Sequence, residues 1–334
     1  GESCKKIEKI EFNKISVKPH PYLPYIYISN FENKGGEKIN FPIKTYQYFV
    51  PKLKTNSLGF YNGIDGNKDF KNEEKKTHIS CLGASTTGNY LEYNNEKYSY
   101  PLELEKILNK ENNKYVVNNC AQGGYNSADI LIRFSLQVID TKPDIVIIYH
   151  AYNDIRSYQV KDFRSDYSNS RRNLGEVIWR FYISSIFPSS TLNFLNYFFH
   201  LWFPNNDRYS LVDSISYKQN LNIDNSEKGI KTYERNLQNL IYLCKSNRIK
   251  VILSTFCFYL HEEISNDYLH LKNKKFVELE NNIIRKLAKE NNLPIVDNDK
   301  LIEKNDNNFV DSIHFSHKGM KKIAENFAEI IKTI

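Results

Sequence analysis

The sequence has few cysteines, and they do not follow the spacing of a metal or redox motif. The five cysteines stand at positions 4, 81, 120, 244 and 257, an odd number with no CxxC pair. Three of them lie in or beside expected strands, so we interpret the cysteines as buried free thiols rather than as disulfides or zinc ligands. Free thiols of this kind argue against an oxidising compartment.

The sequence also lacks long apolar runs and dense clusters of basic residues. No apolar run reaches the about 20 residues of a membrane-spanning helix, and no signal peptide is recognisable. The net charge of +7 is spread over 46 basic and 39 acidic residues, so we expect no nucleic-acid partner. With 334 residues, 40% of them hydrophobic, the chain can form one large or two small domains with a substantial core.

Residues 1–75 show little regular periodicity. Prolines at 19, 21 and 24 exclude a helix in their segment and favour extended backbone. The stretch 54–60 is typical of a turn with apolar anchors. We therefore expect residues 1–75 to form an N-terminal extension packed on a core domain of residues 76–334.

From residue 77 onward, short apolar segments rich in β-branched residues alternate with helical patterns. Apolar segments of this kind are typical of parallel strands that are buried on both faces. Their alternation with helices predicts an α/β fold, with a doubly wound (flavodoxin-like) parallel five-stranded sheet flanked by helices. We expect strands at 77–82, 114–119, 144–150, 249–256 and 294–297, and apolar helical stripes at 104–108, 131–138, 237–244, 283–288 and, after Ser316, 323–331.

A long insertion at 155–227 interrupts this alternation between the third and fourth strands. Its middle, residues 181–203, is rich in Phe, Tyr and Trp but too short to span a bilayer. Three interpretations remain open: helices that pack on the core, a lid that contacts an acyl chain or a sugar, and a helix on a membrane surface.

Four segments place polar residues at or after the expected carboxyl ends of strands, where open α/β sheets carry their chemistry. Ser85 stands in a tight turn after the first strand, within the run 78–88. Two glycines after the second strand, in the segment 119–127, allow backbone N–H groups to approach a ligand closely. The run 83–87 is not G-x-S-x-G, because position 87 is threonine, which argues against the nucleophile elbow of α/β-hydrolases.

The other two segments supply an amide and a carboxylate–imidazole pair. Asn153 follows the third strand and could donate its amide N–H to a developing negative charge. Asp311 and His314 stand three apart on one loop before the last helix, so the carboxylate can orient the imidazole. His150 and His317 are expected to be bystanders, with His150 closing a strand near the site and His317 in the first turn of the last helix.

Together these segments resemble the SGNH hydrolase superfamily, also called the GDSL esterases/lipases. The resemblance covers about residues 77–154 and 230–334 and implies the SGNH hydrolase fold. It assigns Ser85 as nucleophile, His314 as base and Asp311 as its partner, with an oxyanion hole formed by Ser85, Gly124 and Asn153. Ala84 and Ala151 stand where the family more often has Asp and Gly.

The resemblance implies a serine esterase that hydrolyses an O-acyl ester through an acyl-enzyme, with no metal or cofactor. We expect an O-acetyl group on a small molecule, a carbohydrate or a cell-envelope glycan as substrate. An O-acetyltransferase acting on a surface polysaccharide would use the same residues, and a non-catalytic binding module is a further alternative.

The segments 20–22 and 55–60 also resemble bacterial GDSL-like proteins that carry a membrane anchor just upstream. This resemblance implies a natural chain that is tethered at the cell envelope by an N-terminal anchor outside the present sequence. The free cysteines favour the alternative, a cytoplasmic location.

Overall fold

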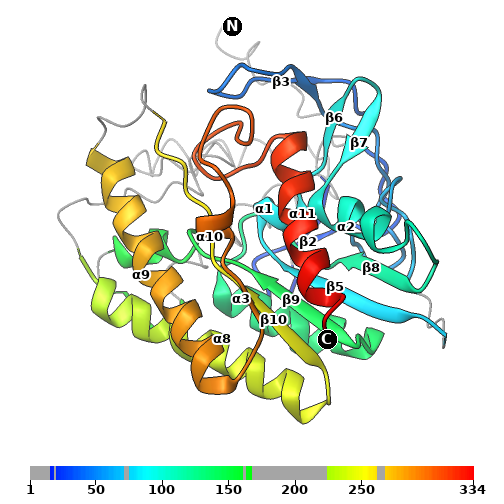
Figure 1. Ribbon diagram of the computed structural model, residues 1–334. Coiled ribbons are helices and arrows are strands. Elements are labelled where there is room, and N and C mark those ends of the chain that lie inside the picture. The colour runs from blue at the N-terminus through cyan, green and yellow to red at the C-terminus, as the bar shows by residue number, and fades with distance from the viewer. Residues whose placement is uncertain (1–15, 19, 71–74, 161–162, 168–223, 262–267) are drawn as a thin grey trace, which may run out of the picture.

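The computed structural model describes residues 16–18, 20–70, 75–160, 163–167, 224–261 and 268–334. At its centre lies a five-stranded sheet with the strand order β11-β10-β9-β5-β8, in which every pairing is parallel (Figure 1). The order confirms the predicted doubly wound, flavodoxin-like sheet. The strands are β5 (Thr77–Gly83), β8 (Tyr115–Asn119), β9 (Ile145–Tyr149), β10 (Lys250–Ser254) and β11 (Ile295–Val296), each inside or within a residue of its predicted range.

Helices cover both faces of this sheet, and successive residues of a strand alternate between them. On β9, Ile145 and Ile147 pack with α2 (Tyr100–Leu108) and α11 (His317–Ile331), whereas Val146 and Ile148 pack with α3 (Ser127–Arg133) and α8 (Ser226–Ser246). The long helix α9 (Tyr268–Asn291) lies beside α8 (Figure 1). Burial on both faces explains why all five residues of β9 are apolar or aromatic.

Side-chain caps fix where the site-flanking helices begin. Ser99 accepts a hydrogen bond from the Leu102 N–H and places Pro101 in the first turn of α2. Ser316 caps α11 by accepting from the Gly319 N–H, so the predicted start of the last helix is confirmed. Asn126 forms a reciprocal capping box with Asp129 at the start of α3. From there the chain continues through a π-helix (Phe134–Val138) and a short 3-10 helix (Ile139–Thr141).

A second, antiparallel sheet of four strands was not predicted from the sequence. It has the order β3-β4-β6-β7, and the hairpin of β6 and β7 turns at Asn94 and Asn95, both with positive φ. Because β4 pairs with β6, the chain before residue 76 shares a sheet with the chain after it. The strands are β3 (Lys38–Ile39), β4 (Tyr48–Phe49), β6 (Leu91–Tyr93) and β7 (Glu96–Tyr98), while β1 (Val17–Lys18) and β2 (Ile26–Tyr27) form a separate pair.

Other expectations concern the insertion and the cysteines. The insertion begins with the short helix α4 (Ile155–Tyr158), but its aromatic part at 181–203 lies outside the described residues. Cys81, Cys120, Cys244 and Cys257 are buried free thiols, as predicted. Among the helices that the structure describes, none is long and apolar enough to cross a membrane.

Candidate active site

Ser85 lies where β5 ends and the four-residue helix α1 (Ser85–Gly88) begins. The chain can turn this sharply because residue 83 is glycine. A Cβ at Gly83 would lie 2.2 Å from the Thr87 Oγ1 and 2.5 Å from the Tyr149 carbonyl oxygen. The missing side chain therefore lets α1 fold back against the end of the strand, and Ser85 remains partly exposed at the edge of the sheet.

His314 reaches Ser85 from a loop 229 residues later in the sequence. Its Nε2 lies 2.9 Å from the Ser85 Oγ, and its Nδ1 lies 2.7 Å from Oδ2 of Asp311. The other carboxylate oxygen of Asp311 accepts hydrogen bonds from the backbone N–H groups of Ile313 and His314. The structure thus brings three of the predicted site residues into one hydrogen-bonded chain of hydroxyl, imidazole and carboxylate.

Electrostatics favour the ionised form of Asp311. Burial acts to raise the pKa of this carboxyl, but the charge of His314 and the hydrogen bonds from His314 and Ile313 lower it below its usual value. The side chains of His314 and Asp311 are 22% and 23% exposed, so the pair is open to solvent on one side.

The glycine loop after β8 lies beside the serine. A Cβ at Gly123 would lie 3.9 Å from the Ser85 Cβ, which is ordinary van der Waals contact. Gly124 has a φ of +79°, and the N–H of Tyr125 donates to the Gln122 carbonyl over 3.4 Å. These features describe a type II turn, whose third residue requires a positive φ. The turn places Gly123 next to the Ser85 side chain, with Gly124 as the following residue.

Asn153 belongs to the loop after β9 and is tied to the glycine loop. Its side-chain Nδ2 donates to the Tyr125 carbonyl over 2.9 Å, which uses one of its two N–H bonds. The preceding residue, Tyr152, has a φ of +67°, and its N–H donates to Oε2 of Glu280 over 2.9 Å. The hydrogen bond to Glu280 thus holds a residue in the left-handed conformation next to Asn153.

Glu280 was missed in the sequence because a glutamate on a helix is usually solvent-exposed. It is fully buried and also accepts a hydrogen bond from the Tyr158 hydroxyl at 2.7 Å. Burial, and next the charge of Asp154, raise the pKa of Glu280 to about 8, although the bonds from Tyr158 and Tyr152 act to lower it.

Asp154 is the centre of a buried polar network beneath the two loops. It accepts hydrogen bonds from the N–H and the hydroxyl of Ser127, at 2.9 and 2.6 Å, and from the hydroxyl of Tyr167. Its Oδ2 lies 2.7 Å from Nε2 of His150. Burial acts to raise the pKa of Asp154, but His150, Ser127 and Tyr167 outweigh it and lower the pKa. Asp154 thereby fastens the start of α3 to the Asn153 loop.

The two bystander histidines have structural partners. His150 is 1% exposed and paired with Asp154, so it does not face an open pocket. His317 lies in the first turn of α11, as predicted, and its Nδ1 is 2.8 Å from the Tyr48 hydroxyl. Neither histidine is bonded to Ser85.

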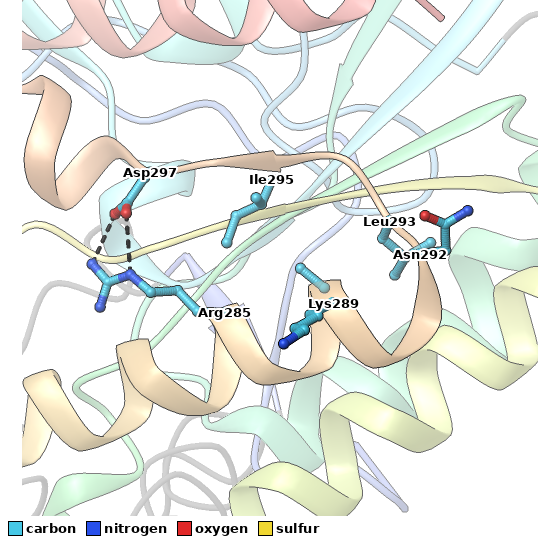
Figure 2. A pocket seen from close by; sticks show the side chains of 7 residues that line it. Arg285, Lys289, Asn292, Leu293, Ile295 and Asp297 are labelled. Atoms are coloured by element: carbon cyan, nitrogen blue, oxygen red, sulfur yellow. Dashed lines mark hydrogen bonds and ion pairs between the residues drawn. The ribbon is translucent and has the colours of Figure 1, made fainter.

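A separate surface cavity lies between the carboxyl-terminal part of α9 and β11, as Figure 2 shows. Its arginine, Arg285, is already engaged with Asp297, through Nε at 3.1 Å and Nη2 at 2.8 Å. None of the residues predicted for the serine site lines this cavity, so it is separate from that site. It is lined by Arg285, Ala288, Lys289, Asn292, Leu293, Ile295 and Asp297.

The site therefore combines a serine hydroxyl, an imidazole able to take its proton, a carboxylate that orients the imidazole, and two joined loops that carry Gly124 and Asn153. This set of groups is suited to acyl transfer without a metal ion. Within the described parts of the chain, no group of three or more His, Cys, Asp or Glu side chains is arranged to hold a metal.

Comparison with known protein families gives a match that covers most of the chain. The sequence model of the GDSL-like Lipase/Acylhydrolase family matches residues 81–322, a range that contains Ser85, Gly124, Asn153, Asp311 and His314. No curated protein sequence matches the chain.

Solved structures of similar fold are distant in sequence. They include a GDSL-like lipase from Bacteroides thetaiotaomicron, 16% identical with a TM-score of 0.43, covering 78% of this chain and 90% of that one. The lipase/acylhydrolase from Enterococcus faecalis is 16% identical with a TM-score of 0.44, covering 77% and 96%. A catalytic mutant of an acetylxylan esterase from Geobacillus stearothermophilus is 17% identical with a TM-score of 0.43, covering 76% and 94%. Because these TM-scores are low, we draw the family assignment from the sequence match alone.

Proposed function

Since the chain belongs to the GDSL-like lipase/acylhydrolase family and is thus a carboxylic ester hydrolase, we propose that it removes a small O-acyl group, in the first place O-acetyl, from a carbohydrate or a cell-envelope glycan. The hydrogen-bonded chain from Ser85 through His314 to Asp311 carries the proposal. A non-catalytic binding module would have no need for this arrangement.

In the proposed reaction, Ser85 attacks the ester carbonyl carbon while His314 Nε2 takes the proton of the Ser85 hydroxyl. Asp311 holds the proton on Nδ1 of His314 and stabilises the imidazolium that forms. His314 then donates its new proton to the departing alcohol oxygen as the ester C–O bond breaks. Water, deprotonated by His314, attacks the acyl-enzyme and releases the acid and free Ser85.

Negative charge develops on the carbonyl oxygen in both steps. We assign its stabilisation to the backbone N–H groups of Ser85 and Gly124 and to the side-chain amide of Asn153. The hydrogen bond from Asn153 to Tyr125 leaves the second amide N–H for this role.

The proposed substrate class follows from the surroundings of the serine. On one side the glycine loop lies close to Ser85, since a Cβ added at Gly123 would lie 3.9 Å from the Ser85 Cβ, and we infer from this closeness that the acyl group is small. On the other side His314 and Asp311 are 22% and 23% exposed. Because His314 protonates the leaving alcohol, we expect the alcohol part of the ester to occupy this open side, where there is room for a large group.

The test is hydrolysis of a panel of esters by the purified protein. We expect acid release from acetyl esters and acetylated glycans, little release from long-chain esters, and no release by Ser85→Ala. The matched control is Ser135→Ala, at an exposed serine, which should retain the activity. A fluorophosphonate probe should label the wild type and Ser135→Ala but not Ser85→Ala.

Two results would change the proposed function. Labelling that persists in Ser85→Ala would refute the nucleophile. Acetyl transfer to a sugar acceptor that outpaces hydrolysis would assign the chain as an O-acetyltransferase using the same residues. An envelope location remains a prediction from the sequence.

A further inference from the structure

Tyr25, in the N-terminal region before residue 76, reaches the glycine loop beside Ser85. Its side chain is 7% exposed, and its hydroxyl donates a hydrogen bond to the Gly123 carbonyl. In return, the hydroxyl of Tyr125 donates to the Tyr25 carbonyl. The two rings meet edge to face with their centroids 5.7 Å apart. Two segments a hundred residues apart in the sequence are thereby fastened by reciprocal bonds.

The bond from Tyr25 falls on the central peptide of the turn. In a type II turn this peptide joins the second and third residues, here Gly123 and Gly124. Rotating this peptide by half a turn converts type II geometry into type I geometry without moving the ends of the turn. Glycine at both positions removes the Cβ contacts that would otherwise resist the rotation. The sequence of the turn therefore leaves its orientation open, and a contact from elsewhere must fix it.

Fixing the Gly123 carbonyl also fixes the Gly124 N–H. The two groups belong to one planar trans peptide and point in opposite directions. A hydroxyl that holds the carbonyl on the Tyr25 side therefore aims the N–H away from Tyr25. Ser85 lies on another side of the same loop, because a Cβ added at Gly123 would point toward Ser85 and lie 3.9 Å from its Cβ. A flipped peptide would instead present a carbonyl oxygen, which repels an oxyanion.

Other contacts support the same loop. Tyr25 closely covers Gly124, because a Cβ there would lie 2.4 Å from the Tyr25 hydroxyl oxygen. The buried Arg133 donates to the Gln122 side chain at 2.8 Å and stacks on Phe60, another residue of the N-terminal region, at 3.9 Å from the ring centroid. Two aromatic residues from before residue 76 thus support the loop that carries Gly124.

We propose that Tyr25 is a positioning residue for the oxyanion hole, and that the N-terminal region completes the active site by holding the Gly123–Gly124 peptide with the Gly124 N–H available to the substrate. This inference rests on the proposed esterase function and deepens it. It makes turnover depend on a segment that contributes no group to the reaction itself.

The experiment compares Tyr25→Phe with Tyr22→Phe in the full chain. Phenylalanine removes the hydroxyl and keeps the ring, and Tyr22 is a control because its side chain is 67% exposed in the same segment. Losing one oxyanion donor typically costs about 100- to 1,000-fold in kcat. In Tyr25→Phe the Gly124 N–H is misdirected rather than removed. We therefore expect kcat to fall by about tenfold or more, but by no more than the loss of a whole donor would cause, with KM little changed. Tyr22→Phe should have the kcat and KM of the wild type.

A second measurement separates positioning from folding. Active sites are titrated with a fluorophosphonate so that kcat refers to folded, reactive protein, and Tm is recorded for each variant. A trifluoromethyl ketone, whose adduct with Ser85 carries an oxyanion, should lose affinity in parallel with kcat. Unchanged kcat per titrated site, with or without a lower Tm, would overturn the positioning role.

A negative result for Tyr25 can be distinguished from failure of the proposed esterase function. If wild type and Ser85→Ala hydrolyse esters equally, the esterase proposal fails whatever Tyr25 does. If only Ser85→Ala is inactive and Tyr25→Phe equals wild type, the esterase proposal stands and the role of Tyr25 is refuted.

Discussion

The side-chain amide of Asn153 donates a hydrogen bond to the backbone carbonyl of Tyr125 over 2.9 Å, and this bond joins the two loops beside Ser85. One loop follows β9 and the other follows β8. The two strands are not neighbours, because β5 lies between them in the sheet. Asn153 therefore spans the end of β5, the strand that leads into Ser85, and this position suits a donor to the substrate's carbonyl oxygen.

We predict that Asn153→Ala lowers kcat by about 100- to 1,000-fold, the usual cost of losing one oxyanion donor. KM should change much less, because the lost interaction is strongest in the transition state. Steady-state kinetics on an acetyl ester, with Tm as the control for folding, measure both quantities. An increase in KM at constant kcat would mean that Asn153 binds substrate rather than the oxyanion.

We predict that Asp311→Asn leaves the fold intact and lowers kcat by roughly four orders of magnitude, because an amide stabilises the wrong tautomer of the imidazole. The lowered pKa of Asp311 keeps this carboxylate ionised at neutral pH in the wild type. Asp306→Asn is a suitable control, since that carboxylate lies nearby but is 47% exposed. Near-wild-type turnover in Asp311→Asn would show that another group orients His314.

We predict that Glu280→Gln makes stability less dependent on pH. The folded-state pKa of Glu280 is raised to about 8, whereas an unfolded glutamate titrates near about 4.3. Between these values the native state retains a proton that the unfolded state loses, so the free energy of unfolding falls as pH rises. Glutamine does not titrate, and its amide oxygen can still accept the Tyr152 N–H.

The measurement is Tm of the wild type and of Glu280→Gln at pH 5 and pH 8. The variant should gain stability relative to wild type at the higher pH. Glu290→Gln, at a side chain 53% exposed on the same helix, should follow the wild type at both values. A constant difference between Glu280→Gln and wild type would show that Glu280 is ionised over the whole range.

We predict that Asp154→Ala destabilises the fold by about 3–5 kcal/mol, because the buried groups of Ser127, Tyr167 and His150 lose their partner and each unsatisfied buried group typically costs about 1–3 kcal/mol. Because the pKa of Asp154 is lowered in the folded state, its contribution is present above the unfolded pKa of about 3.9 and is lost as pH falls through the lower folded value. Urea unfolding at pH 7 measures the difference, which should shrink in acid. Asp140→Ala, at an exposed position, is the control.

The sequence by itself determined the central sheet and the kinds of groups in the site. Buried parallel strands leave a local signature, because a segment covered on both faces must be apolar along its whole length. Asp311 and His314 could likewise be paired from their spacing, since the loop that carries both is short. The family resemblance added Ser85, Gly124 and Asn153 as one set.

Tertiary structure decided how these groups are held. The two-residue strands β3 and β4 carry no periodicity because they are too short to repeat, and they are joined to the rest of their sheet by the pairing of β4 with β6, about forty residues later in the sequence. From the sequence, Glu280 is expected on an exposed helix surface. The fold instead buries it, where it accepts a hydrogen bond from the Tyr152 N–H. The sequence around Tyr25 likewise gives no sign of its role, because only the fold brings its hydroxyl to the distant Gly123 carbonyl. The local sequence leaves the orientation of the Gly123–Gly124 peptide free, since neither residue has a Cβ, and the tertiary contact with Tyr25 sets it.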